Sequence, residues 1–212
     1  MSSGYLTVAG RGEAEYEDKH SRFIGHVAPA STEAEAKAFV EEIRSQYADA
    51  THNVFAYLLR SGDVMRWSDD GEPGGTSGQP TLNVLQGAGI SDVCCVTTRY
   101  FGGILLGSGG LVRAYSNAVR KALDAAGLAR MTPWRKAAFS CGYAQYDKLR
   151  RMLEDRGARV ENTAFGADVS VIFSAPEEQC GLICARILDA TAGEIEVRCA
   201  DETVFRPTVL EK

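Results

Sequence analysis

Hydrophobic and polar positions alternate with two different periods along the first half of the chain. A period of two over Thr7–Glu17 and over Arg22–Val27 predicts two paired strands joined by a polar turn. Thr32 and Glu35 form a capping box, and the apolar spacing that follows predicts a helix over about 32–46. The chain therefore opens with a hairpin and a helix.

Four shorter elements follow: strands at Asn53–Leu59, Val64–Trp67 and Val93–Arg99, and a helix near Pro80–Gln86. The segment Val93–Arg99 is the most β-prone, so we expect it at the centre of a sheet. From Ser108 the apolar spacing becomes helical, and Gly127 is expected to end that helix.

The last part of the chain predicts the order β-α-β-β-α-β, which is the ferredoxin-like split βαβ. Its strands are expected at 134–142, 158–165, 168–174 and 194–205; its helices are expected at 145–156 and from the Ser174 cap, with Pro176 in the first turn, to near Gly193. Ser174 and Glu177 are expected to cap the second helix. The segment Leu128–Pro133 is a plausible boundary, which gives domains of 1–130 and 134–212 in an α+β protein.

Composition limits the broad class of protein. The chain is 45% hydrophobic and 24% charged, as in water-soluble globular proteins. It has no apolar run near the roughly 20 residues of a membrane helix, and its N-terminus lacks the features of a signal peptide. We therefore expect a cytoplasmic protein without a membrane partner.

Charge is distributed unevenly along the sequence. Residues 99–136 carry 7 basic side chains and 1 acidic one, net +6. Residues 1–98 are net −7 and residues 137–212 are net −4. The concentrated positive charge favours binding of an anion or nucleic acid at this segment, although the acidic flanks would keep binding weak and salt-sensitive.

The six cysteines are predicted to be buried free thiols. No CxxC pair occurs, and Cys180 and Cys184 share a helix face but lack a nearby histidine for a zinc site. Cys94 and Cys95 would point to opposite faces of a strand. The sequence predicts no metal site and identifies no cofactor.

The start of the helix at Ser108 is the strongest candidate site. A helix N-terminus offers unpaired N–H groups and partial positive charge to an anion. Gly107, Ser108, Gly109 and Gly110 leave this start unobstructed, and Arg99 or Arg113 could add charge. The alternative is that the glycines serve close packing of strand and helix.

A glycine-rich loop at residues 68–80 carries acidic residues. Asp69, Asp70 and Glu72 could hold Mg²⁺ beside a phosphate, or could instead cap and hydrogen-bond the loop itself. His52 could face this loop or be a structural histidine. No triad or GxSxG motif is present, so the sequence supports no catalytic residue.

Aromatic side chains accompany the basic residues. Tyr100 and Phe101 next to Arg99 could stack on bases, while Arg120 and Lys121 continue a basic helix face with Arg113. The alternative is an ordinary solvated helix face.

Several runs closely resemble the IMPACT/YigZ family: KHSRFIGH (19–26), HNVFAYLL (52–59), SDDGEPGGTSGQP (68–80), NVLQG (83–87) and TRYFGGILLGSGGLVRAY (98–115). The resemblance implies an N-terminal domain similar to domain 2 of ribosomal protein S5, followed by a domain similar to domain V of elongation factor G. Eukaryotic relatives regulate translation by binding the activator of a starvation-sensing kinase.

These observations lead to one main hypothesis and two alternatives. The main hypothesis is a non-enzymatic RNA- or ribosome-associated factor in translation or its regulation. The first alternative is an enzyme or sensor that binds a phosphorylated small molecule or nucleotide at the glycine-rich helix start, and the second is a protein-interaction adaptor. The oligomeric state stays open.

Overall fold

The computed structural model describes residues 4–210, apart from the Glu202 side chain. Contacts divide the chain into two compact units. The N-terminal domain holds residues 5–130 together with residues 207–210, and the C-terminal domain holds Gly4 and residues 131–206.

An antiparallel sheet of five strands forms the N-terminal domain. Its order is β2 (Gly12–Asp18), β3 (Ser21–Pro29), β6 (Val93–Tyr100), β4 (His52–Leu59) and β5 (Val64–Ser68). The central place of β6 is as predicted. A short 3₁₀ turn, η1 (Ser61–Asp63), joins β4 to β5.

The first predicted strand, Thr7–Glu17, is wrong as a single element. The structure has a separate strand β1 (Tyr5–Val8) before β2. The Ala9 N–H donates to the Gly127 carbonyl, which draws the chain away from the β2 line before Gly12. A period of two continues across such a bend, so the pattern alone does not reveal it.

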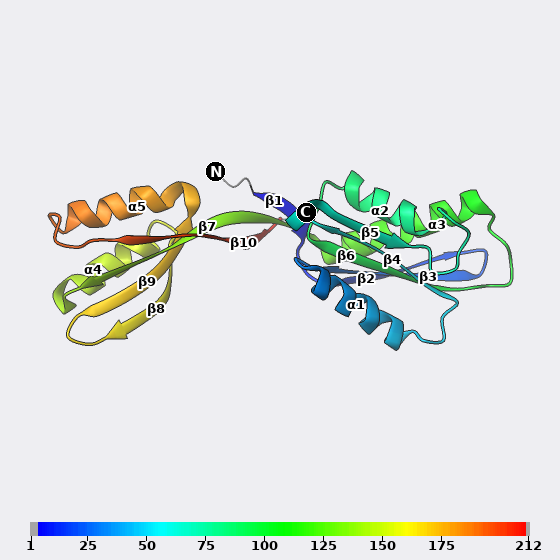
Figure 1. Cartoon of the computed structure of the whole chain (residues 1–212), viewed down its shortest axis with the longest axis horizontal. Helices are drawn as coiled ribbons and strands as arrows, with labels where there is room; N and C mark the ends of the chain where they lie inside the picture. Colours follow the sequence, from blue (N-terminus) through cyan, green and yellow to red (C-terminus); the bar gives the residue numbers. More distant parts are fainter. Residues whose placement is uncertain (1–3, 211–212) are drawn as a thin grey trace. The chain divides into compact units, whose positions relative to one another are not determined.

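Helices cover both faces of this sheet (Figure 1). On one face lies α1 (Glu33–Gln46), and on the other lie α2 (Gly78–Gly87) and α3 (Ser108–Ala126). Along β6, Cys94 packs in the core beneath α1, whereas Cys95 packs in the core beneath α2 and α3. The expectation that these two cysteines face opposite ways is confirmed.

Two predicted helix ends are confirmed. Thr32 accepts from the Glu35 N–H at 3.2 Å while the Glu35 carboxylate accepts from the Thr32 N–H at 3.3 Å, completing the capping box of α1. Gly127 ends α3 with φ 68° and ψ 172°, a conformation open essentially to glycine alone.

The C-terminal domain has the predicted ferredoxin-like order. Its elements are β7 (Leu128–Cys141), α4 (Tyr143–Glu154), β8 (Arg159–Phe165), β9 (Val169–Pro176), α5 (Glu177–Ala190) and β10 (Arg198–Val209). The sheet order is β10-β7-β9-β8, and β1 also pairs with β7. Phe139 and Phe173 of the sheet share one core with Leu149 of α4 and Ile183 of α5, so both helices pack on the same face.

One expectation for this part of the chain is corrected. Ser174 does not cap α5, because it lies within β9 and its hydroxyl donates to Glu161; Pro176 is the residue at the helix start. Contacts divide the chain between residues 130 and 131, inside the segment 128–133, and this segment belongs to the long strand β7.

Candidate anion-binding site at the start of α3

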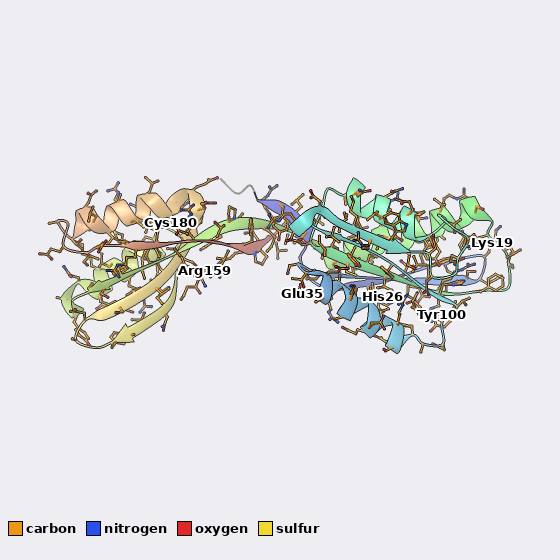
Figure 2. All side chains as sticks on the ribbon, viewed as in Figure 1. Lys19, His26, Glu35, Tyr100, Arg159 and Cys180 are labelled. Carbon is orange, nitrogen blue, oxygen red and sulfur yellow. The ribbon has the colours of Figure 1, made fainter. Side chains whose placement is uncertain are left out.

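The candidate residues gather at one end of the N-terminal sheet, where β6 finishes and β4 begins. His52 opens β4 directly opposite Arg99 near the end of β6. Tyr100, labelled in Figure 2, closes β6 beside Arg22, and Lys19 of the turn between β2 and β3 lies at the same end. The loop between β5 and α2 and the loop before α3 also reach this end.

A buried carboxylate lies beneath this surface. The Glu72 side chain is 3% exposed, and its Oε1 accepts from Arg99 Nη1 at 2.6 Å and from the Tyr115 hydroxyl at 2.7 Å. His52 Nε2 lies 3.9 Å from the second oxygen. Burial, together with the Glu72 charge, raises the pKa of Tyr115 well above its usual range, so the phenol stays a donor. One oxygen of Glu72 is thus held by two buried donors, and the other lies near His52.

Arg99 does not lie at the surface, as its predicted role required. Its guanidinium is paired with Glu72, and Ser21 Oγ accepts from Nη2 at 3.4 Å. The rings of Phe23 and Phe101 lie 5.3 and 5.4 Å from its central carbon. Because the guanidinium is buried and paired with Glu72, Arg99 stabilises the end of β6 and is not accessible to a surface ligand, although its Nε has no hydrogen-bond partner within the described part of the chain.

Asp69 acts as an internal cap. Its Oδ1 accepts from the N–H groups of Ser77 and Gly78 at 3.1 and 2.8 Å and from the Ser77 hydroxyl, and its Oδ2 accepts from the Gly75 N–H. Burial opposes ionisation, but these donors win and hold the pKa of Asp69 below its usual value. The carboxylate therefore closes the loop and neutralises the start of α2.

Asp70 ties the same loop to the sheet. It accepts from the Asn53 N–H at 2.7 Å and from Arg44 at 3.0 Å, and its carbonyl lies 2.7 Å from His52 Nδ1. With Asp69, Asp70 and Glu72 all used by the chain's own donors, the structure supports the interpretation of these acids as loop-building groups. His52 likewise has the contacts of a structural histidine.

The loop before α3 is anchored at its base and open beyond it. The Phe101 N–H donates to Thr51 Oγ1, and the Gly102 N–H donates to Ser21 Oγ. A side chain at Gly102 would lie 2.0 Å from the His20 backbone, so only glycine fits. Past this anchor, Ile104 and Leu105 are 45% and 82% exposed.

The start of α3 is uncapped and accessible. Gly107 takes the N-cap position with φ 70° and ψ 165°, and it supplies no side-chain hydrogen bond. A Cβ added at Gly107 would meet nothing within 4 Å, and one added at Gly109 would meet only Arg113 Nη1, at 3.9 Å. Gly110 differs, because it is buried and Leu106 fills its side-chain space. Gly110 therefore serves close packing against Leu106. Gly107 and Gly109 instead leave the N-terminus of the helix open.

The predicted basic face divides into two parts. Arg113 lies on the first turns of α3 and is exposed. Arg120 lies about 10 Å further along the helix, where it donates to Asn117 and lines a groove between α2 and α3. Lys121 donates to the Glu15 carbonyl at 3.2 Å. Of these three basic residues, Arg113 is the one at the open helix start.

The two aromatic residues also differ. The Tyr100 hydroxyl donates to Asp49 at 2.8 Å, which ties this ring to the loop after α1. Phe101 is 45% exposed. Of the predicted stacking residues, Phe101 is therefore the accessible one.

Sequence reasoning missed two kinds of residue here. The helical spacing after Ser108 did not reveal the hydrogen bond of Tyr115 to Glu72, although a phenol in an apolar stripe usually has a buried partner. It also passed over Ile104 and Leu105, whose apolar side chains inside a glycine-rich loop had no strand or helix to bury them.

Comparisons with known proteins match both domains of the chain. A model described as the Impact N-terminal domain matches residues 19–123, and one described as a domain of unknown function (DUF1949) matches residues 139–194. The IMPACT family member YvyE of Bacillus subtilis is 34% identical over 99% of this chain and 97% of its own length. The chain belongs to the IMPACT family.

Other members and a solved structure extend the match. The IMPACT family member YigZ of Escherichia coli is 35% identical over 88% of this chain and 93% of its own. A crystal structure of a hypothetical protein has a TM-score of 0.64 at 33% identity, covering 95% of this chain and 100% of that one. Among residues 4–210 no helix has the length and apolar character needed to cross a bilayer.

Proposed function

We propose that this IMPACT family protein is a non-enzymatic, cytoplasmic RNA- or ribosome-associated factor in translation or its regulation, and that it holds RNA phosphate at the start of α3. The observation that carries the proposal is the uncapped glycine start at Gly107–Gly109, with exposed Arg113 beside it. Unpaired N–H groups at a helix start suit a phosphate, and a guanidinium adds charge.

Neighbouring side chains favour RNA as the source of that phosphate. Phe101, Ile104 and Leu105 are exposed apolar residues of the loop that leads into the open helix start. Single-stranded nucleic acids bind where charge follows the backbone and flat apolar groups meet the bases. The resemblance of both domains to translation proteins supports the same partner.

A phosphorylated small molecule or nucleotide would use the same N–H groups. The structure favours it less, because nucleotide sites commonly include Mg²⁺ and a carboxylate to hold it. Asp69, Asp70 and Glu72, the carboxylates of the adjacent loop, already accept hydrogen bonds from the protein. A protein-interaction adaptor would use the surface without any dependence on anions.

The test is binding to a mixed rRNA and tRNA pool at two salt concentrations. We expect binding that weakens with salt, and in Arg113→Ala a slope of log K against log salt that is shallower by about 0.7 to 1. Lys37→Ala is the matched control, since Lys37 lies on α1 across the sheet and its loss removes the same charge. The Lys37→Ala variant should change the slope of log K against log salt only by the small amount that the loss of one distant positive charge produces.

Three outcomes would contradict the proposal. One is no binding to RNA or ribosomal particles at either salt concentration. Another is equal loss in Arg113→Ala and Lys37→Ala, which would mean non-specific charge attraction. The third is binding of free nucleotides in preference to RNA, which would assign the helix start to a small molecule.

A further inference from the structure

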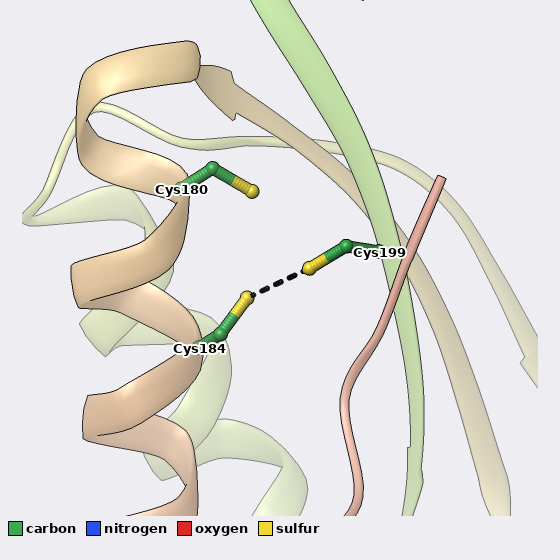
Figure 3. Close-up of side chains that lie close together, drawn as sticks. All are labelled: Cys180, Cys184 and Cys199. Atoms are coloured by element: carbon green, nitrogen blue, oxygen red, sulfur yellow. Dashed lines mark hydrogen bonds between the residues drawn. The ribbon is translucent and has the colours of Figure 1, made fainter. Parts of the chain in front are cut away.

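Three cysteine thiols of the C-terminal domain converge on one point. Cys180 and Cys184 lie one turn apart on α5, and Cys199 lies on the facing strand β10 (Figure 3). The three sulfur atoms all lie within 4.8 Å of one another, and those of Cys184 and Cys199 are 3.4 Å apart. Figure 3 shows the three side chains directed toward one another.

We infer that this cluster is a binding site for a thiophilic d¹⁰ metal ion, Zn²⁺ or Cu⁺. Sulfur atoms bonded to one tetrahedral ion at about 2.3 Å lie about 3.8 Å apart, by geometry. The Cys184–Cys199 separation of 3.4 Å and the limit of 4.8 Å that all three sulfur pairs satisfy are compatible with that value. Small rotations of the side chains would bring all three sulfurs to the ion.

The fold holds the three ligands in place. Cys180 is 2% exposed and belongs to the domain core, Cys184 is half-buried, and Cys199 is exposed. An i, i+4 pair on a helix projects from the same face. The cluster therefore has a fixed buried side and an accessible side through Cys199, where an ion can enter and where water or an added ligand can complete its coordination.

The donor set selects the class of metal. The three histidines lie at positions 20, 26 and 52, outside the C-terminal domain, and within the described part of the chain the cluster consists of three cysteines, so sulfur is its donor. Thiolate ligands select Zn²⁺ and Cu⁺ over Mg²⁺ or Ca²⁺. Burial raises the pKa of Cys180 and Cys184, so these thiols carry protons in the metal-free protein, and the ion displaces one proton for each thiolate it binds.

A disulfide between Cys184 and Cys199 is the competing account of the cluster. It would use two sulfurs, would leave the convergence of Cys180 unexplained, and would need an oxidant to accept two electrons. A metal ion uses all three. The sequence foresaw only that Cys180 and Cys184 share a face, because Cys199 reaches them through the tertiary fold.

The experiment titrates the reduced full-length protein with Cd²⁺, as a spectroscopic probe for Zn²⁺, and separately with Cu⁺. We expect one ion per chain by native mass spectrometry and, for Cd²⁺, an ultraviolet thiolate-to-metal absorption band. Cys199→Ser should remove both signals; its exposed position leaves the core intact. Cys141→Ala, which removes a buried thiol of the same core outside the cluster, should keep them.

Either ion bound in this pattern supports the site. Absence of a stoichiometric complex, or a complex that survives in Cys199→Ser, would overturn it. Recovery of a chain lighter by two hydrogen atoms, with Cys184 linked to Cys199 and no metal uptake after reduction, would also overturn it and would assign the pair to redox chemistry.

Discussion

The two helices on one face of the N-terminal sheet begin in opposite ways. At α2, the Asp69 carboxylate accepts from the Ser77 and Gly78 N–H groups and so satisfies the helix start from within the protein. At α3, the N-cap is Gly107, which has no side chain to accept anything. Both helices present the same partial positive charge, so the difference separates a start closed by the protein from an uncapped one, and it is the uncapped start that we propose as the phosphate contact.

The residues around the N-termini of α2 and α3 differ in the same way. The acids beside α2 and β4 are matched by internal donors, as in the pairing of Glu72 with Arg99 and Tyr115. Beside α3, Phe101 and Leu105 are exposed. The loop with charged residues is thus the closed part of the region, and the loop with glycine and apolar residues is the open part.

The largest expected loss of stability comes from substituting Glu72, the buried carboxylate that accepts from Arg99 and Tyr115. Glu72→Ala leaves the buried Arg99 guanidinium and the Tyr115 hydroxyl without their acceptor, and should lower the free energy of unfolding by about 3–5 kcal/mol. Urea unfolding measures it, with Glu17→Ala at an exposed position near the end of β2 as the control. A loss no larger than that of Glu17→Ala would mean that the buried pair does not hold this end of the sheet.

Gly107→Ala strains the backbone at the open start. With φ 70° and ψ 165°, the position lies in a region that side chains avoid, so we expect a loss of about 1–3 kcal/mol. Gly74→Ala is the control, because a Cβ there meets nothing within 4 Å and φ is not positive. Equal stability of the two variants by thermal or urea unfolding would contradict the conformation of this helix start.

Asp69→Ala removes the internal cap of α2 and should cost about 1–2 kcal/mol at neutral pH. Because the donors around it hold the pKa of Asp69 below its unfolded value, the contribution is complete above the unfolded pKa and is lost as pH falls through the folded one. Urea unfolding of both proteins at neutral and acidic pH should show a gap that closes in acid. A gap independent of pH would argue against an ionised cap.

Gly109→Ala has the smallest effect on stability and the most specific effect on binding. Alanine in an exposed helix should leave the fold unchanged or stabilise it by up to about 1 kcal/mol, while its methyl group obstructs the approach of phosphate. Gly181→Ala on α5 is the matched control, since its Cβ meets nothing within 4 Å. RNA titrations in which both variants bind like the unsubstituted protein would rule out the α3 start as the contact.

Local pattern predicted most of the secondary structure. The capping box of Thr32 and Glu35 and the stop at Gly127 depend on neighbours in the sequence, and both are confirmed. Ser174 and Glu177 have the same spacing, but pairing of β9 with β7 and β8 draws Ser174 into a strand. Tertiary pairing outweighed the local signal there.

The candidate site was predictable only in part. The glycines before α3 identified an accessible helix start, because their effect is local. The burial of Arg99 was not visible, since its partner Glu72 comes from a loop 27 residues away in the sequence. The charge of residues 99–136 was also misleading, because Arg99 and Arg135 are neutralised by Glu72 and Glu177, which lie outside that segment.

The most direct test of the open α3 start is backbone N–H chemical shifts on titration with a short single-stranded RNA. The account predicts shifts at Ser108, Gly109 and Gly110 that weaken with salt, and none at Gly78, whose N–H is already held by Asp69. Shifts at Gly78, or RNA binding that leaves Ser108–Gly110 unchanged, would contradict it.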